Sequence, residues 1–457
     1  MYGYILVSVL LSSSPSLDLA DPTALIAELG ASRFSRREAA EAAIARMGRA
    51  AIPMLRASRT HPDLEIRDRA AGLLRRIEAS LLTEPTNILL DFNDVSLVEA
   101  MTTINQRDGL RLNLAPENPA VWAERRLTLR SAEPLPFWKA IDALCGAAGL
   151  HTVLGGQTEF DQGETGLSLY DGFASSQGLF DDRGPFRIQL TSLHYQSEVH
   201  LGSEHGETRG GTLPPSSRAG TGRATAASSR QFFLQLVVGA EPRLAIVPGG
   251  PAQVTEAIDE QGRSLVAPHR PKLIRHDSGY QGVSPSPLVH VRLDLNYPDP
   301  PATRIKRIRG TIPLVVSTRR PDPLVIPLAD AASHQFRQGR MAIKVGPSQK
   351  EGPDQMTSIE LNITANERAA AQADGPLAAA DDPLAIASPQ HLEILDAEGR
   401  MIPWFPTRSI SDGATATVTL TLIDRGVVPG VPTAIRYHDL ISDRTEVAFE
   451  FRDLPMP

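Results

Sequence analysis

Hydrophobic and polar positions divide the chain into three stretches with different periodicities. From about residue 22 to 82, apolar residues recur at spacings of three and four, which predicts amphipathic helices. From 86 to 154, short alternating runs flank two helical patterns. After residue 155 the apolar positions alternate with period two, as in half-buried antiparallel strands. The pattern predicts a multidomain α+β protein with an N-terminal α-helical repeat pair, a small βαββαβ domain and an antiparallel β-sandwich region.

The helical stretch contains an internal repeat. Arg-Arg-Glu-Ala-Ala at residues 36–40 recurs as Arg-Asp-Arg-Ala-Ala at residues 67–71, an offset of 31 residues. A fixed offset of this size indicates helical repeats, in which small residues let two helices approach closely. Residues 51–55 and 63–74 resemble the two helices of a HEAT repeat. The resemblance implies a HEAT-like pair over residues 21–83, which is too short for a free solenoid and is expected to dock on the next domain.

The second stretch is a duplication at an offset of 40 residues. Ser96 and Glu99 form a capping box, so a helix should begin there and stop at Gly109. A second helix should begin at Pro136 and stop at Gly149. The matching positions of the two halves are Leu97 with Phe137, Ala100 with Ala140, Ile104 with Leu144, Gly109 with Gly149, and Leu110 with Leu150.

Residues 91–97 (Asp-Phe-Asn-Asp-Val-Ser-Leu) and their echo at 134–140 resemble the short N-terminal (STN) domain of bacterial secretins and TonB-dependent transducers. In that family the domain is a periplasmic interaction module without catalysis. The resemblance implies an STN-like module over residues 86–154 that contacts partners between about residues 97 and 129, by strand addition or groove packing. No secretin core follows, so a secretion-pore or transporter function is not implied.

The β-patterned remainder predicts two sandwiches, at residues 184–346 and 357–457. Three stretches of biased composition are expected to be loops or linkers. They are residues 203–230, which would be a disordered insertion in the first sandwich, 267–287 and 365–382.

Residues 1–20 combine an uncharged apolar run with a following Ser- and Pro-containing stretch, which predicts a signal peptide. No Lys or Arg precedes the apolar run, so a buried N-terminal strand or a misplaced start codon is the alternative. No other stretch reaches the roughly 18 apolar residues of a membrane-spanning helix. Export would therefore deliver a periplasmic or cell-envelope protein with no membrane span after signal removal.

The net charge, the placement of basic residues and the single cysteine exclude some classes of function. With 46 basic and 53 acidic residues the net charge is −7, which argues against a nucleic-acid partner. One basic cluster surrounds the apolar residues 312–316, and we interpret it as protection of an exposed strand edge. Its members are Arg304, Lys306, Arg307, Arg309, Arg319 and Arg320. The single cysteine, Cys145, is expected to be a core residue.

The residue types that bind metals are most closely spaced at His194, Glu198 and His200, which are followed by His205. A strand would hold His194 and Glu198 about 13 Å apart, so one strand cannot bring them together. They are weak metal candidates, and no cofactor is predicted. Trp404 is a weak candidate for an exposed partner contact. The sequence contains no Gly-x-Ser-x-Gly, His-Glu-x-x-His, Gly-Lys-Ser/Thr or Cys-x-x-Cys motif, so no catalytic residue is predicted.

Three functions are compatible with these features. The first is a non-catalytic exported interaction or scaffold protein that binds other envelope proteins and contacts polysaccharide. The second is a hydrolase of a cell-surface polymer, with its site in the sandwich loops and acid-base or metal groups between His194 and His200. The third is a cytoplasmic helical-repeat adaptor whose apolar N-terminus is buried.

Overall fold

The structure is a computed structural model that describes most of the chain. The described residues are 22–106, 110–115, 119–154, 166–172, 178–202, 225–267, 286–329, 334–338, 341–351, 356–365, 383–384, 386–423 and 431–457. The chain forms two compact units, which meet in the sequence between Leu81 and Leu82. The predicted signal peptide lies outside the described residues. None of the described helices combines the length and apolar character needed to cross a membrane.

The first unit is helical. Its elements are α1 (Pro22–Glu28), α2 (Phe34–Met47), the 3-10 turn η1 (Gly48–Ala51), α3 (Ile52–Ala57), the 3-10 turn η2 (Ser58–Thr60) and α4 (Leu64–Thr83). Ala40 of α2 and Ala70 of α4 are fully buried. The 31-residue offset would match Ala40 with Ala71 instead, so the sequence repeat is shifted by one residue from the repeat of buried positions.

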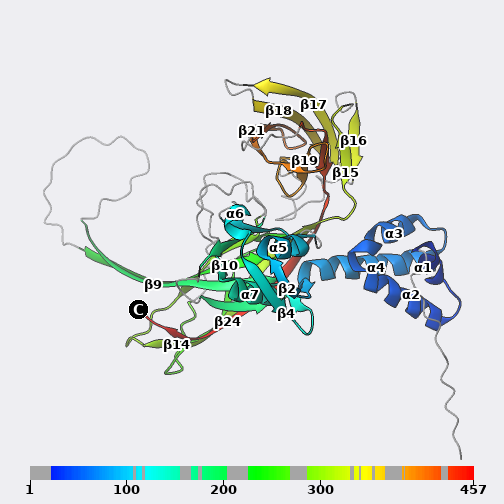
Figure 1. Cartoon of the computed structure of the whole chain (residues 1–457). Helices are drawn as coiled ribbons and strands as arrows, with labels where there is room; N and C mark the ends of the chain where they lie inside the picture. Colours follow the sequence, from blue (N-terminus) through cyan, green and yellow to red (C-terminus); the bar gives the residue numbers. More distant parts are fainter. Residues whose placement is uncertain are drawn as a thin grey trace, which may run out of the picture. The chain divides into compact units, whose positions relative to one another are not determined.

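The second unit is mostly β, with several antiparallel sheets, in agreement with the expected β-rich multidomain class (Figure 1). It begins with an α/β region, residues 87–171. Its elements are β1 (Asn87–Ile88), β2 (Asp91–Ser96), α5 (Leu97–Asn105), β3 (Leu112–Ala115), α6 (Pro119–Trp122), β4 (Arg126–Arg130), β5 (Leu135–Pro136), α7 (Phe137–Ala148), β6 (Leu150–Thr152) and β7 (Leu167–Asp171).

Helices α5 and α7 occupy the predicted positions. The Ser96 side chain accepts a hydrogen bond from the Glu99 amide, and α7 ends at Gly149 with a φ of 64°. The end of the first helix was predicted wrongly: α5 ends at Asn105, and Gly109 lies outside the described residues. The Asn105 amide pairs with both the N–H and the carbonyl of Leu112, which draws the chain into β3. Strand β7, parallel to β3, was not predicted.

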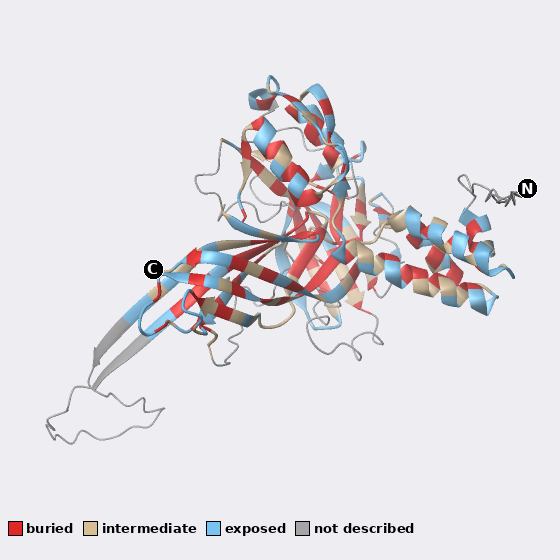
Figure 2. Cartoon of the chain, turned by 90° about the horizontal axis from the view of Figure 1, so that it is seen from below, coloured by how far each residue is buried: buried red, intermediate tan, exposed pale blue. Residues whose placement is uncertain are grey.

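A two-sheet region follows. One sheet has the order β13-β10-β9-β8, and the other has β11-β14-β12 with β24 along β14. The strands are β8 (Leu179–Arg183), β9 (Phe186–Gly202), β10 (Thr225–Ala240), β11 (Leu244–Pro248), β12 (Gln253–Asp259), β13 (Leu288–Leu295), β14 (Arg304–Arg319) and β24 (Leu440–Pro455). In β13 every second residue is buried, and Figure 2 shows the same alternation along parts of other strands.

Strand β14 is central. It pairs with β11 and β12 on one side and with β24 on the other, so the expected edge-protection role of its basic residues is wrong. A proline is tolerated within it because of a gap between β11 and β12. On the side of β14 that faces this gap, the Pro313 carbonyl accepts a hydrogen bond from the Gly249 amide. The N–H and the carbonyl of one residue in an antiparallel strand point to the same side, so the N–H that proline lacks would also point into the gap.

An inserted region, residues 324–437, lies between β14 and β24. Its two sheets have the orders β15-β23-β19-β20 and β16-β17-β18-β22-β21. The strands are β15 (Leu324–Pro327), β16 (Gln335–Gln338), β17 (Met341–Glu351), β18 (Met356–Ala365), β19 (Leu392–Leu395), β20 (Met401–Ile402), β21 (Trp404–Ser411), β22 (Thr415–Leu422) and β23 (Ala434–Tyr437). Side chains of both sheets share one core, which includes Ile326, Leu361 and Ile394.

The strand pairing therefore divides the β region differently from residues 184–346 and 357–457. Strands β15 to β17 belong with the inserted region, and β24 returns to the preceding sheet, because its pairing with β14 runs from Arg304 opposite Pro455 to Arg319 opposite Leu440. The predicted insertion 203–230 is also too long, since β10 begins at Thr225. Most of the predicted linkers 267–287 and 365–382 lies outside the described residues.

Candidate functional site

The chain enters and leaves the inserted region at a neck, which we define as residues 319–323 and 436–440. Arg319 ends β14 and Leu440 begins β24, and the two are direct partners in the ladder. The next residues keep the two segments together: the Arg320 amide donates to the Asp439 carbonyl, and the Arg320 Nε lies 2.9 Å from Asp439 Oδ2. The whole inserted region is therefore connected through two adjacent backbone segments.

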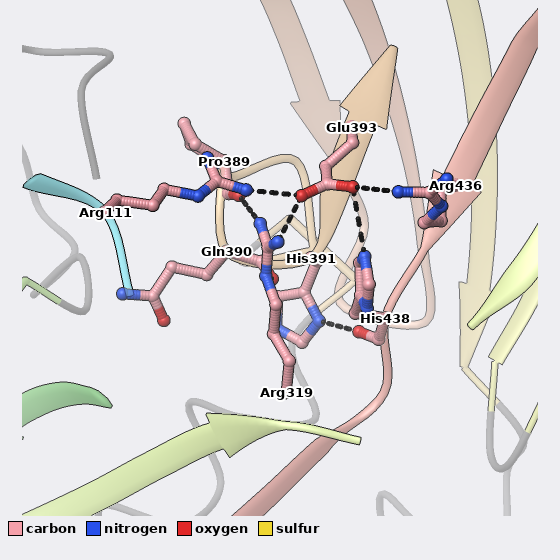
Figure 3. Close-up of polar contacts among 8 residues, drawn as sticks. All are labelled: Arg111, Arg319, Pro389, Gln390, His391, Glu393, Arg436 and His438. Carbon is pink, nitrogen blue, oxygen red and sulfur yellow. Dashed lines mark hydrogen bonds and ion pairs between the residues drawn. The ribbon is translucent and has the colours of Figure 1, made fainter. Parts of the chain in front are cut away.

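A buried carboxylate, Glu393, lies beside this neck (Figure 3). It belongs to β19, all of whose residues are buried, and its side chain is only 5% exposed. Its Oε1 accepts from Arg111 Nη2 at 2.5 Å and also from Arg319. Its Oε2 accepts from Arg436 Nη1 at 3.0 Å and from His438 Nε2 at 3.3 Å. We call these five residues the Glu393 cluster.

The cluster joins three regions of the second unit. Arg111 directly precedes β3 of the α/β region, Arg319 ends β14 of the two-sheet region, and the other members belong to the inserted region or its exit. Arg319 also donates to two main-chain carbonyls, from Nε to Gln390 at 2.9 Å and from Nη2 to Pro389 at 2.5 Å. One carboxylate therefore fixes guanidinium groups from two other regions.

A second histidine, His391, is hydrogen-bonded to the neck. His391 Nδ1 donates to the His438 carbonyl at 2.9 Å, and the His438 amide donates to the His391 carbonyl. The imidazole of His391 stacks on Tyr437 with ring centroids 5.9 Å apart. The His438 Nδ1 atom is buried and has no hydrogen-bond partner among the described residues. A proton added there would gain no acceptor, which favours the neutral imidazole.

Burial and charge set the protonation states. Burial lowers the pKa of His391 to about 4, and burial also lowers the pKa of His438. Burial by itself would raise the pKa of Glu393, but the hydrogen bond from His438 and the charge of Arg319 outweigh it and hold that pKa well below its ordinary value. At neutral pH the cluster thus combines one carboxylate, three guanidinium groups and a neutral imidazole.

This arrangement suits structural locking better than proton transfer. Each oxygen of Glu393 already accepts two hydrogen bonds, so the carboxylate is saturated and firmly ionised. A general base needs a pKa near the working pH and access to a substrate proton, and Glu393 has neither. Removing one partner of such a network would leave buried charge uncompensated, which is costly.

A second ion-pair cluster joins the α/β region to the two-sheet region. Arg187, 2% exposed, donates to Asp142 of α7 at 2.7 and 2.6 Å and to Asp182 of β8 at 2.7 Å. Its guanidinium carbon lies 4.8 Å from the ring centroids of both Trp138 and Phe180. This cluster again fixes one region on another with a buried arginine.

The metal candidates all lie on β9 or beyond it. The strand carries His194, Glu198 and His200 in register with β10, and His205 lies outside the described residues. Among the described residues, no group of three His, Cys, Asp or Glu side chains is placed to hold a metal ion. His194 is exposed, stacks on Phe233 with centroids 4.9 Å apart, and its Nε2 lies 2.6 Å from Ser192 Oγ.

The other singled-out residues have packing or pairing roles. Trp404 is 6% exposed and belongs to the core of the inserted region, so the expected exposed contact is wrong. Cys145 is buried in α7, and burial raises the pKa of its thiol to about 12. In the basic cluster, Arg307 and Arg309 both pair with Glu256 at 2.5 Å.

Sequence reasoning missed Glu393, although its surroundings contained a signal. Glu393 stands in the run His-Leu-Glu-Ile-Leu at residues 391–395, where every residue is buried. A carboxylate inside a short apolar strand must be paired if the strand is buried. Its partners are 282 and 74 residues away for Arg111 and Arg319, a distance that local periodicity cannot bridge.

Comparison of the chain with protein-family models, curated proteins and solved structures finds no match in any of the three.

Proposed function

We propose that this protein is a non-catalytic scaffold of the bacterial cell envelope that presents several partner-binding surfaces in a fixed arrangement. The observation that carries the proposal is the convergence of three regions on Glu393. Locking regions to one another with a saturated, buried ion-pair network serves the positioning of surfaces, whereas a reactive site needs unsaturated groups. The partners are other envelope proteins, and polysaccharide is a further contact.

The resemblance of residues 86–154 to STN domains and of residues 21–83 to HEAT repeats supports this proposal, because both are protein-binding modules. Among the described residues between 97 and 129, the expected contact surface, two large apolar side chains are exposed. They are Val98 of α5, 36% exposed, and Val121 of α6, 49% exposed. Exposed apolar residues on a predicted interaction module are the natural anchors for a partner.

The proposal is tested by crosslinking and affinity recovery of the full chain from an envelope fraction. We expect Val98→Lys and Val121→Lys to reduce recovery of specific partners about tenfold, since each buries a charge at the contact. Val325→Lys, at a 51% exposed position of the inserted region, is the matched control and should retain full recovery. Sequencing of the mature N-terminus should show that Met1 has been removed.

Unchanged partner recovery by both variants would contradict the proposed surface. An intact N-terminus with the protein in the cytoplasmic fraction would contradict export and favour the helical-repeat adaptor.

One observation favours hydrolysis as a second candidate function. Ser192 Oγ and His194 Nε2 are 2.6 Å apart, within reach of a nucleophile and its base. Gln235 Oε1, 2.9 Å from the same hydroxyl, competes for its single proton. No hydrogen bond from His194 to a carboxylate is found among the described residues, and Asp294, on β13 beyond β10, pairs with Arg292 at 2.9 Å. Labelling of wild type but not Ser192→Ala by a fluorophosphonate would favour the hydrolase over the scaffold.

A further inference from the structure

The inserted region has a core of its own. The residues of this core run from Ile326 to Tyr437 and all belong to the inserted region. The core of the α/β region instead includes Val237 of β10, and Leu288 of β13 packs against it. The α/β region and the two-sheet region therefore share apolar packing, and we call the two together the base. The neck and the polar contacts of the Glu393 cluster connect the inserted region to this base.

The neck has the properties of a hinge. Residues 320–323, between β14 and β15, and residues 438–439, between β23 and β24, lie outside the strands. Pro321 and Pro323 have no N–H, so the entering segment cannot continue a ladder. Hinges are commonly a few residues at the ends of elements, where changes in φ and ψ turn one body against another. Arg319 directly precedes this segment, so its hydrogen bonds to the inserted region lie beside the pivot.

Arg111 contacts the same carboxylate from a different part of the base (Figure 3). Its carbonyl accepts from the Leu167 amide at 2.9 Å, which fixes the residue at the start of β3 and β7. Its Nη2 donates to Glu393 Oε1 at 2.5 Å, and its side chain is 28% exposed. The other oxygen of the carboxylate is held by Arg436, the direct partner of Glu393 on β23, and by His438 of the neck. Loss of the Arg111 bond would therefore leave Glu393 paired and the inserted region folded.

His438 makes this connection sensitive to pH. Its Nε2 donates to Glu393 Oε2 at 3.3 Å, and its Nδ1 is buried with no hydrogen-bond partner among the described residues. Burial lowers the pKa of His438, and the charges of Arg319 and Arg436 act in the same direction. A second proton on the ring would add a fourth cation beside a single carboxylate.

The ionisable groups around His438 come from several segments of the chain. They are Glu393 of β19, His391 before β19, Arg436 of β23, Arg319 of β14, Arg111 before β3, and the adjoining neck residues Arg320 and Asp439. Arg320 and Asp439 pair with each other at 2.9 Å, so Glu393 is the carboxylate that must balance the other guanidinium groups and any proton on His438.

We propose that the inserted region is a hinged module, that the ion pair of Arg111 and Glu393 latches it to the base, and that a proton on His438 opens the latch. Once the inserted region has turned away from Arg111, water reaches the cluster and the pKa of His438 returns towards its ordinary value of 6.5. The open form then binds the proton more tightly than the closed form, so acid favours opening. The arrangement of surfaces is thus fixed near neutral pH and changes in acid. This opening does not depend on the envelope function proposed above.

The test is the distance between two spin labels on the full chain, measured by pulsed electron spin resonance. Cys145 is buried and the pKa of its thiol is raised to about 12, so the labels are attached to introduced cysteines. Lys139→Cys of α7 marks the base and Ser409→Cys of β21 marks the inserted region, both at exposed positions. We expect one narrow distance at about pH 7.5 and a second population at about pH 5.5. Linkage to one group with an ordinary pKa of 6.5 raises the ratio of open to closed form by up to about tenfold over this range.

Variants at two positions identify the latch and its trigger. Arg111→Gln should populate the open form at both pH values, whereas Arg111→Lys, which keeps the charge, should remain closed at the higher pH. His438→Gln keeps a donor for Glu393 but cannot gain a proton, so it should remain closed in acid. His334→Gln, the same replacement at an exposed histidine of the inserted region, is the matched control and should open like the wild type.

A wild-type distance that does not change with pH overturns the switch, and an Arg111→Gln variant that stays closed overturns the latch. Opening of His438→Gln in acid overturns the role of His438 as the trigger. A second label pair, Lys139→Cys with Thr255→Cys of β12, lies wholly in the base and should keep one distance throughout. A change in that distance would show general loosening of the fold and would overturn the hinge.

Discussion

At the scale of single residues, Glu393 connects three regions of the second unit. Its carboxylate is the counter-charge to Arg111, Arg319 and Arg436 at once. Gathering three partly buried cations around one buried anion is tolerable only while the anion remains, because desolvation of the guanidinium groups is offset by that single charge. The residue is therefore a determinant of stability.

Glu393→Gln should lower the free energy of unfolding by about 3–5 kcal/mol, because the isosteric amide keeps the volume and removes the charge. Urea denaturation of the full chain measures this. Glu398→Gln is the control, since that side chain is 64% exposed and should change stability by less than about 0.5 kcal/mol. A Glu393→Gln variant as stable as this control would show that the cluster does not hold the regions together.

The buried histidines make stability depend on pH in a definite direction. The ordinary pKa of His391 is 6.5 and burial lowers it to about 4 in the folded chain, so the unfolded chain binds this proton first as pH falls. The stabilisation is present above pH 6.5 and is lost between 6.5 and about 4. Lowering of the pKa of Glu393 acts in the same direction at still lower pH.

Thermal melts of the wild type and His391→Gln across this pH range test the assignment. The wild-type melting temperature should fall steeply as pH drops from 6.5 towards 4, and the variant, in which the amide can still donate to the His438 carbonyl, should fall less. Parallel curves would show that another group, such as His438 or Glu393, causes the loss.

At the scale of elements, two glycines of one helix should respond oppositely to alanine. Gly149 ends α7 with a φ of 64°, where a Cβ is strained, so Gly149→Ala should cost about 1–2 kcal/mol. Gly146 lies inside α7 and an added Cβ would meet no atom within 4 Å, so Gly146→Ala should add about 0.5–1 kcal/mol. Denaturant melts of the two variants measure the two changes in stability, and all other features of the helix are the same in both variants. Changes of equal sign would contradict this account.

Local signals predicted the elements better than their partners. The capping residues Ser96 and Glu99 located the start of α5, since capping depends on residues three apart. The end of α5 depends instead on a bond between Asn105 and the backbone seven residues on, which no cap motif encodes. For the same reason the Glu393 cluster was missed, because its partners come from other regions of the chain.

At the scale of the whole molecule, strands that pair in a sheet can lie far apart in the sequence, as β14 and β24 do. The alternation of residues in β24 is typical of a strand, but a period of two does not indicate which strand it pairs with. The inserted region lies in the sequence between β14 and β24, which pair with each other along their whole length. The C-terminal strand therefore completes a sheet whose other strands lie more than a hundred residues earlier. A truncation that removes β24 would consequently damage the two-sheet region.

This topology predicts that the inserted region can be removed without unfolding the rest. The Arg320 amide donates to the Asp439 carbonyl directly beyond the pair of Arg319 and Leu440, so replacing residues 321–438 by Asn-Gly should close β14 and β24 with a two-residue hairpin. The ladder itself stays intact, and the inserted region keeps its own core, to which both of its sheets contribute. Hydrogen exchange should therefore show protected amides along β14 and β24 in the shortened chain, and a protected core in residues 324–437 expressed alone. Loss of protection along β14 in the shortened chain would mean that the Glu393 cluster, and not the ladder, holds the sheet together.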